Sequence, residues 1–224
     1  MFTRCFSLLT FSILIQACNL YSEGYSKDSY EGVKNKSQAT FAGGCFWCIE
    51  APFDKTPGVL SAISGYSGGD QNNPTYEQVS SGQTNHLEAV LVTFDSTVIN
   101  YTTLLNIYWQ QFDPTDPSGS FVDRGHQYTS AIFFHNENQK TQALASKMYL
   151  EKSGRFDMPI VTEIIPFKVF YPAEEYHQDY HIKNSTHYNF YRSGSGRDEF
   201  ILETWSKNPL DLTKSLNRSL SSMQ

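Results

Sequence analysis

The order of strands and helices between residues 39 and 135 constrains the fold of this chain most. Short apolar runs predict strands, and apolar residues repeating about every 3.6 positions predict helices. The six main segments are a strand at 39–42, a helix at 45–55, strands at 59–66 and 86–94, a helix at 100–112 and a strand at 128–135. This β-α-β-β-α-β order is that of the split βαβ, or ferredoxin-like, fold. We therefore expect one α+β domain.

Further segments add helix and strand to this core and leave long polar loops. The pattern predicts a short helix capped at Asn73-Pro74, a helix over 136–153, a strand over 160–165 and a short helix over 173–181. Asp, Pro and Gly indicate a loop over 113–127. The folded domain is expected to span 39–200, followed by a polar tail over 201–224.

Length and charge limit the classes of function. The chain has 224 residues, and 39% of them are hydrophobic, which is enough for one core. It carries 17 Lys and Arg against 23 Asp and Glu, a net charge of −6 at pH 7. A chain this acidic is poorly suited to bind phosphate backbones, so we expect no nucleic-acid partner.

Residues 1–17 have the pattern of a secretory signal. Arg4 precedes an apolar run over 6–15, which is too short to span a bilayer but has the length of a signal h-region. The run ends in Ile15-Gln16-Ala17-Cys18, which resembles the bacterial lipoprotein cleavage box, where the cysteine is lipidated. The alternative is ordinary cleavage after Ala17. We expect an extracytoplasmic, membrane-anchored lipoprotein, or else a secreted or periplasmic soluble protein.

The segment 18–38 is polar and is predicted to be a flexible tether between the anchor and the folded domain. With Cys5 and Cys18 in the targeting region, the domain keeps only Cys45 and Cys48. One close C-x-x-C pair favours a redox role. A structural zinc site would need two further ligands at matching spacing, so we expect no bound metal.

Cys45 follows two glycines and precedes a predicted helix. Free N–H groups at a helix start stabilise an anion, which predicts a lowered pKa and a nucleophilic thiolate at Cys45. Cys48 is one turn further along the same face and could form a disulfide with an oxidised Cys45. Two buried, inert cysteines are the alternative interpretation.

Two aromatic side chains are candidates for the same site, and one glutamate stands on an apolar strand face. Phe46 and Trp47 are large aromatics beside the nucleophile and could hold a small apolar group, or they could belong to the core. Glu88 shares a strand face with Val90 and Val92, where burial would raise its pKa and keep it protonated. From periodicity alone, a solvated strand end is the simpler interpretation of this glutamate.

Ordered motifs extend over most of the predicted domain. They comprise Gly43-Gly44-Cys45-Phe46-Trp47 with Glu50; Gly65-Tyr66-Ser67-Gly68-Gly69 and Asn73-Pro74-Thr75-Tyr76; Val79, Ser80, Gly82, Thr84, His86 and Glu88; D-x-G-x-Q-Y at 123–128; and Y-x-A-E-x-x-H-Q-x-Y at 171–180. These motifs, over about residues 39 to 192, resemble those of peptide methionine sulfoxide reductase A. The resemblance implies reduction of the S epimer of methionine sulfoxide, free or in proteins, as a repair of oxidised chains.

The resemblance also implies the roles of individual residues. Cys45 would be the nucleophile that becomes a sulfenic acid, Glu88 the acid, and Tyr76 and Tyr128 the phenol donors. Asp123 matches a polar residue of the pocket and Tyr180 a further tyrosine there, while Phe46 and Trp47 match the cage for the substrate methyl group. No bound cofactor is implied, and the reductant would be a thioredoxin-like partner. We expect a monomer.

Cys48 departs from the family pattern, because most members carry glycine at this position. Many members also have resolving cysteines near the carboxyl end, and this chain has no cysteine after Cys48. Cys48 is therefore the candidate that resolves the sulfenic acid to a disulfide. Two other functions stay open: a dithiol–disulfide exchange protein, and a non-catalytic module that binds peptides through its tyrosine-rich surface.

Overall fold

The computed structural model describes residues 32–207 and 209–212. The chain divides into two units, Met1–Lys34 and Asn35–Gln224, and the fold below is that of the second unit. The expected signal segment 1–17, the lipidation site Cys18 and most of the tether 18–38 lie outside the described residues. Within the described ranges, every helix is too short or too polar to cross a membrane.

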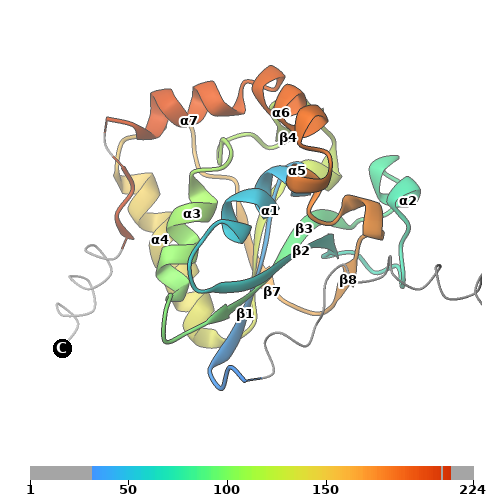
Figure 1. The fold of residues 1–224 in the computed structure, drawn as a ribbon. Helices are drawn as coiled ribbons and strands as arrows, with labels where there is room; N and C mark the ends of the chain where they lie inside the picture. The colour runs from blue at the N-terminus through green and yellow to red at the C-terminus, as the bar shows by residue number, and fades with distance from the viewer. Residues whose placement is uncertain (1–31, 208, 213–224) are drawn as a thin grey trace, which may run out of the picture. The chain divides into compact units, whose positions relative to one another are not determined.

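A six-stranded sheet forms the centre of the fold, in the order β7-β6-β1-β3-β2-β8 (Figure 1). The strands are β1 (Lys36–Gly43), β2 (Val59–Ser67), β3 (Leu87–Asp95), β6 (Ser130–Phe134), β7 (Glu163–Pro166) and β8 (Phe170–Pro172). The four inner strands run in the order fourth, first, third, second along the chain, which is the ferredoxin-like arrangement. The predicted α+β fold is confirmed, with β7 and β8 added at its two edges.

Three helices pack on one face of the sheet: α1 (Phe46–Asp54), α3 (Tyr101–Trp109) and α4 (Glu137–Lys152) (Figure 1). Alternate residues of β3, among them Val90 and Val92, enter the core under these helices because strand side chains alternate between faces. The helices α3 and α4 begin where predicted, since Asn100 and Asn136 accept hydrogen bonds from backbone N–H groups at 2.9 Å.

The connections differ from the prediction at several points. The loop expected over 113–127 contains a two-stranded hairpin of β4 (Gly119–Ser120) and β5 (Asp123–Arg124), and Tyr128 ends a 3-10 turn, η2 (His126–Tyr128), instead of starting a strand. The single helix predicted over 173–181 is wrong. The segment instead forms two short elements, η3 (Glu175–His177) and α5 (Tyr180–Lys183), because Asp179 between them adopts a left-handed conformation with φ of 54°.

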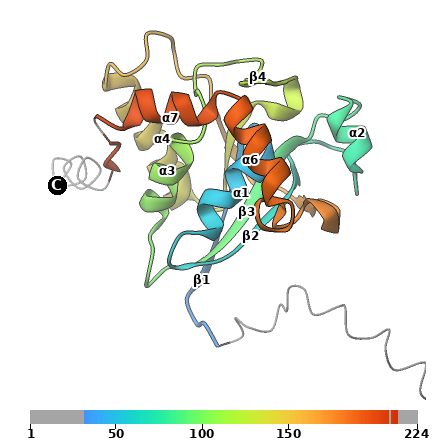
Figure 2. The same cartoon turned by 45° about the horizontal axis from the view of Figure 1, so that its top comes forward.

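Two helices near the carboxyl end, α6 (Ser185–Gly194) and α7 (Arg197–Trp205), have no counterpart in the sequence prediction. Figure 2 shows them running one after the other, with α6 over α1. Tyr188 of α6 packs against Cys48 and Ala51 of α1. Trp205 and Leu212 are buried in the main core, so the carboxyl-terminal segment is part of the packed unit.

Candidate active site

The strand directions bring residues that are distant in sequence to one end of the sheet. β1 is antiparallel to β3 and β6, with Phe41 opposite Val90 and Gly43 opposite Ser130. The end of β1 therefore lies beside the starts of β3 and β6. Cys45 follows β1, Glu88 is the second residue of β3, and Tyr128 lies two residues before the start of β6.

The chain turns from β1 into α1 through two glycines that have no room for a side chain. A Cβ atom at Gly43 would lie 2.7 Å from the Phe112 ring. Gly44 has φ of +98°, and a Cβ atom there would lie 2.5 Å from the Ser120 side chain. This turn places Cys45 at the N-cap position of α1.

Cys45 and Cys48 form a buried, reduced pair, with exposed fractions of 6% and 0%. Burial raises the pKa of the Cys45 thiol well above its ordinary value, and its hydrogen bond to Cys48 raises it further. The same hydrogen bond lowers the pKa of Cys48 to about 6, helped by the positive charges of Arg197 and Arg192. Burial of Cys45 therefore opposes the lowered pKa that the helix start alone predicts for this thiol.

Glu88 lies on the helix-facing side of β3 and is 2% exposed. Its Oε2 accepts a hydrogen bond of 3.0 Å from the backbone N–H of Phe46, the residue after Cys45. Burial raises the pKa of Glu88 to about 8, although this hydrogen bond acts in the opposite direction. The carboxyl is thus largely protonated at neutral pH, and a solvated strand end is excluded.

Tyr76 and Tyr128 contribute two phenol groups near Cys45 and Glu88. Burial is the main cause that raises the pKa of Tyr76 to about 12 and the pKa of Tyr128 further. Negative charge on Glu88 or Cys45 acts in the same direction on both tyrosines. Both hydroxyls are therefore hydrogen-bond donors at neutral pH. Glu174 fixes Tyr76 by accepting its backbone N–H at 2.9 Å.

Asp123 has a partner that the sequence prediction missed. The hydroxyl of Tyr191, on α6, donates to Asp123 Oδ2. Burial raises the pKa of Asp123, while this hydrogen bond and the Arg197 charge lower it. Tyr188 and Tyr191 repeat at helical spacing, and this signal could have indicated α6 but not the contact with Asp123.

Aromatic rings cluster around Trp47, two residues after Cys45. The Phe46 and Trp47 ring centroids are 6.3 Å apart, and Tyr180 stacks on Trp47 at 3.8 Å with nearly parallel planes. The Tyr180 hydroxyl pairs with Nδ1 of His187, and the Tyr180 ring face lies on Trp47. The Trp47 indole N–H is 3.2 Å from Nδ1 of His177, whose pKa burial lowers to about 4, so a neutral imidazole can accept this bond.

Glu50, Asp54 and His181 are the residues that could offer ligands to a metal ion within the described part of the chain. One ligand atom of each lies within 4.8 Å of the others. The Glu50 oxygens already accept hydrogen bonds from the Ser64 hydroxyl at 2.5 Å and the Asp179 N–H at 2.7 Å. Burial raises the pKa of Glu50 to about 8 and that of Asp54 to about 7, which favours protons on these carboxyls.

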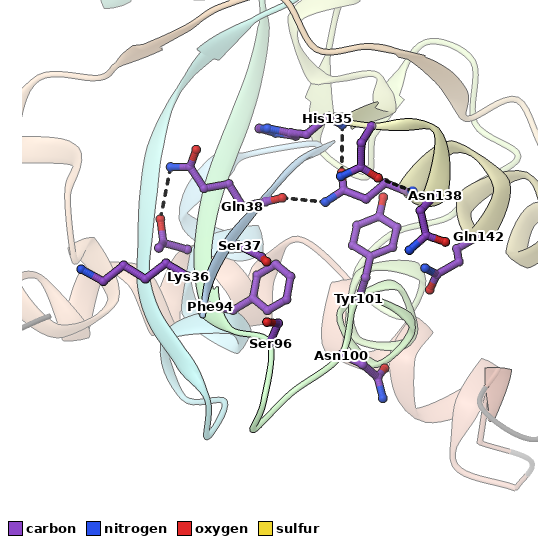
Figure 3. A pocket seen from close by; sticks show the side chains of 13 residues that line it. Lys36, Ser37, Gln38, Phe94, Ser96, Asn100, Tyr101, His135, Asn138 and Gln142 are labelled. Atoms are coloured by element: carbon purple, nitrogen blue, oxygen red, sulfur yellow. Dashed lines mark hydrogen bonds between the residues drawn. The ribbon is translucent and has the colours of Figure 1, made fainter. Parts of the chain in front are cut away.

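A separate polar pocket lies between the start of β1 and the amino-terminal ends of α3 and α4 (Figure 3). Lys36, Gln38, Asn100, His135 and Gln142 are among its lining residues. None of the residues proposed for catalysis lines it. Neither Cys45 nor Cys48 is among its lining residues.

Comparison with known proteins relates this geometry to a family. The sequence profile of the family described as peptide methionine sulfoxide reductase matches residues 37–209. A peptide methionine sulfoxide reductase MsrA of Listeria monocytogenes is 56% identical over 168 residues, covering 75% of this chain and 95% of that protein. The MsrA/MsrB protein of Vibrio cholerae is 49% identical over 195 residues, which cover 86% of this chain and only 52% of that longer protein.

Two solved structures are similar in fold. Reduced Mxr1 from Saccharomyces cerevisiae has a TM-score of 0.62 and 30% identity, over 67% of this chain and 87% of that one. Methionine sulfoxide reductase A of Corynebacterium diphtheriae has a TM-score of 0.61 and 32% identity, over 69% of this chain and 77% of that one.

Proposed function

The chain belongs to the peptide methionine sulfoxide reductase family, and from this premise we propose that it reduces the S epimer of methionine sulfoxide, free or in proteins, to methionine. It is an oxidoreductase that acts on methionine sulfoxide. The proposed nucleophile is Cys45. The observation that carries this proposal is the buried, protonated Glu88, hydrogen-bonded to the residue next to Cys45.

The first step needs a nucleophile for sulfur and an acid for oxygen. As Cys45 attacks, its proton passes along the hydrogen bond to Cys48, whose sulfur holds the negative charge of the resting pair. Glu88 protonates the sulfoxide oxygen, and the hydroxyls of Tyr76 and Tyr128 donate to it. The S–O bond breaks, methionine leaves, and the Cys45 sulfur, oxidised by two electrons, carries the hydroxyl group.

Cys48 is proposed to resolve the sulfenic acid. Cys48 first releases the proton that it took up in the first step. Its thiolate then attacks the Cys45 sulfur, an S–S bond forms, the S–O bond breaks, and the hydroxyl takes a proton and leaves as water. The positions support this step, because Cys48 N–H bonds to Cys45 O at 3.0 Å within a single turn and no loop must close. A thioredoxin-like dithiol is proposed to reduce the disulfide and restore both thiols.

Phe46, Trp47 and Tyr180 are proposed to hold the methyl group of the substrate. Their rings meet beside Cys45, and the His177 imidazole fixes the Trp47 ring through the indole N–H. Asp123 and Tyr191 are proposed to complete the polar side of the same cavity, since Asp123 acts electrostatically on Cys45 and accepts the Tyr191 hydroxyl.

Reduction of separate sulfoxide epimers tests the function. With dithiothreitol, the full chain is expected to convert the S epimer of a methionine sulfoxide peptide to methionine and to leave the R epimer unchanged. Chiral chromatography of the products measures both. Consumption of the R epimer, or of neither, would contradict the proposal. Insulin reduction without any sulfoxide tests the alternative dithiol exchange function, and we expect only background activity.

We also propose that the protein is a monomeric lipoprotein held outside the cytoplasm through Cys18. The support is the signal pattern over 1–17 and the polar segment 18–38. The native amino-terminal peptide is expected to begin at a lipid-modified Cys18, and mass spectrometry of protein from its host membrane checks this. An unmodified cysteine after cleavage at Ala17 would instead support a secreted or periplasmic protein.

A further inference from the structure

Arg197 is a completely buried cation whose known partners are neutral. Its exposed fraction is 0%. The guanidinium donates to the Gln111 carbonyl oxygen and to Ser120 Oγ, and it stacks over the Phe121 ring at 4.8 Å. Its Nε has no hydrogen-bond partner. Among the described residues, no carboxylate lies within salt-bridge distance of it.

A buried charge without a counter-charge is costly, so buried arginines are normally paired with an anion. Arg197 lies against the turn that leads to the dithiol, because a Cβ atom on Gly44 would be 3.1 Å from its Nη2. The groups near it that can carry a negative charge are Cys48 and Asp123. Asp123 already accepts a hydrogen bond from the Tyr191 hydroxyl, whereas the hydrogen-bond partner of the Cys48 sulfur is the Cys45 thiol.

We propose that Arg197 is a positioning residue for the resolving step, whose buried guanidinium keeps the Cys48 sulfur as a thiolate for attack on the Cys45 sulfenic acid. The proposal rests on the proposed function. Arg192 assists from α6, where its Nη1 donates to the Tyr188 hydroxyl at 3.2 Å and Tyr188 packs on Cys48. Arg192 lies in α6 and Arg197 in α7, so both positive charges come from the carboxyl-terminal helices.

Charge is needed at Cys48 because only the thiolate attacks the sulfenic sulfur. During resolution the Cys48 thiolate donates the electron pair of the new S–S bond, the S–O bond of the sulfenic acid breaks, and the hydroxyl takes a proton and leaves as water. The titratable and charged groups that act on Cys48 are Cys45, Glu88, Asp123, Tyr188, Tyr191, Arg192 and Arg197. Of these, the two arginines supply positive charge, and Arg197 has the larger effect on Cys48.

The first measurement is the Cys48 pKa itself. In a full-length background with Cys5, Cys18 and Cys45 changed to serine, Cys48 is the only thiol. The absorbance of its thiolate is followed as a function of pH in three proteins, which carry Arg197, Arg197→Met or Arg197→Lys. Arg197→Met is expected to raise the Cys48 pKa by about two units, because the buried positive charge is lost, and Arg197→Lys to restore most of the shift. An unchanged pKa would overturn the proposal.

The second measurement is the lifetime of the sulfenic acid in otherwise native protein. After one turnover with methionine S-sulfoxide, Arg197→Met is expected to release one methionine per chain. Its disulfide should form roughly tenfold more slowly at pH 7, because a smaller fraction of Cys48 is thiolate at that pH. The rate of disulfide formation should recover as the pH rises and Cys48 ionises. A dimedone trap with mass spectrometry measures this. Resolution at the wild-type rate would contradict the role.

Arg155→Met is the matched control. Arg155 also contacts α7, donating to the Thr204 carbonyl and stacking over Trp205 at 4.3 Å, but it lies away from the dithiol. Arg155→Met is expected to leave the Cys48 pKa and the rate of disulfide formation unchanged, and equal slowing in this variant would reduce Arg197 to a structural role.

If Arg197→Met does not fold, Arg197→Gln removes the charge and keeps hydrogen-bond donors. If wild-type protein forms no methionine, the proposed function fails, whereas the Cys48 titration still decides the inference.

Discussion

Replacing Cys45 by serine is expected to abolish methionine formation, including the first turnover. A serine hydroxyl is far less ionised than a thiol and a much weaker nucleophile for sulfur, so the rate should fall by roughly a thousandfold or more. The loss should not come from unfolding, because Ser is nearly isosteric and position 45 caps α1 in a conformation that serine accepts well. Rapid quenching with chromatography of released methionine measures the first turnover.

Cys48→Ser is the matched variant one turn away. It is expected to release one methionine per chain, because Cys45 remains, but to stop before disulfide formation and to lose cycling with thioredoxin. Methionine release by Cys45→Ser would identify another nucleophile. Normal thioredoxin-coupled cycling by Cys48→Ser would show that the resolving sulfur lies elsewhere.

Glu88→Gln is expected to lower the rate of methionine formation by roughly 10²–10⁴, the usual contribution of a general acid. The glutamine can still accept the Phe46 N–H, so the local hydrogen bond is kept while the transferable proton is lost. In the wild-type protein the acid loses its proton as the pH rises through about 8, so the single-turnover rate should fall there. The variant should lack this decline.

Single-turnover rates across the pH range measure both effects. Glu77→Gln is the control, because Glu77 is exposed on α2 (Tyr76–Ser80), next to Tyr76 in the chain, so the same exchange of glutamate for glutamine is made at the surface. It is expected to keep the wild-type rate and pH profile. If the single-turnover rate of Glu88→Gln falls at alkaline pH as that of the wild type does, the acid is another group.

Much of the core followed from local patterns. Val90 and Val92 mark one face of β3 at period two and put Glu88 on that face, but the family motifs, and not the periodicity, favoured a buried acid over a solvated strand end. The β-α-β-β-α-β order predicted the arrangement of the inner strands. The motifs around Cys45, Tyr76 and Tyr128 identified the residues that the structure brings to one end of the sheet.

Other features depend on contacts between distant segments and were not predictable. The contacts of Tyr191 with Asp123 and of Arg197 with Gln111 join residues 68 and 86 positions apart. The Cys45 pKa was misjudged for the same reason: the helix start is visible in sequence, but burial and the arginines beside Cys48 are properties of the packed chain. Asp179, a non-glycine residue in a left-handed conformation, concealed the break between η3 and α5.

The placement of α6 and α7 has a consequence for biosynthesis. Cys45 and Cys48 leave the ribosome long before Tyr188, Arg192 and Arg197 are translated. Until those helices dock, Cys48 lacks the packing of Tyr188 and the positive charges of Arg192 and Arg197. The nascent polypeptide therefore carries its nucleophile in an untuned form, and full redox competence arrives only when the last folded segment has been made.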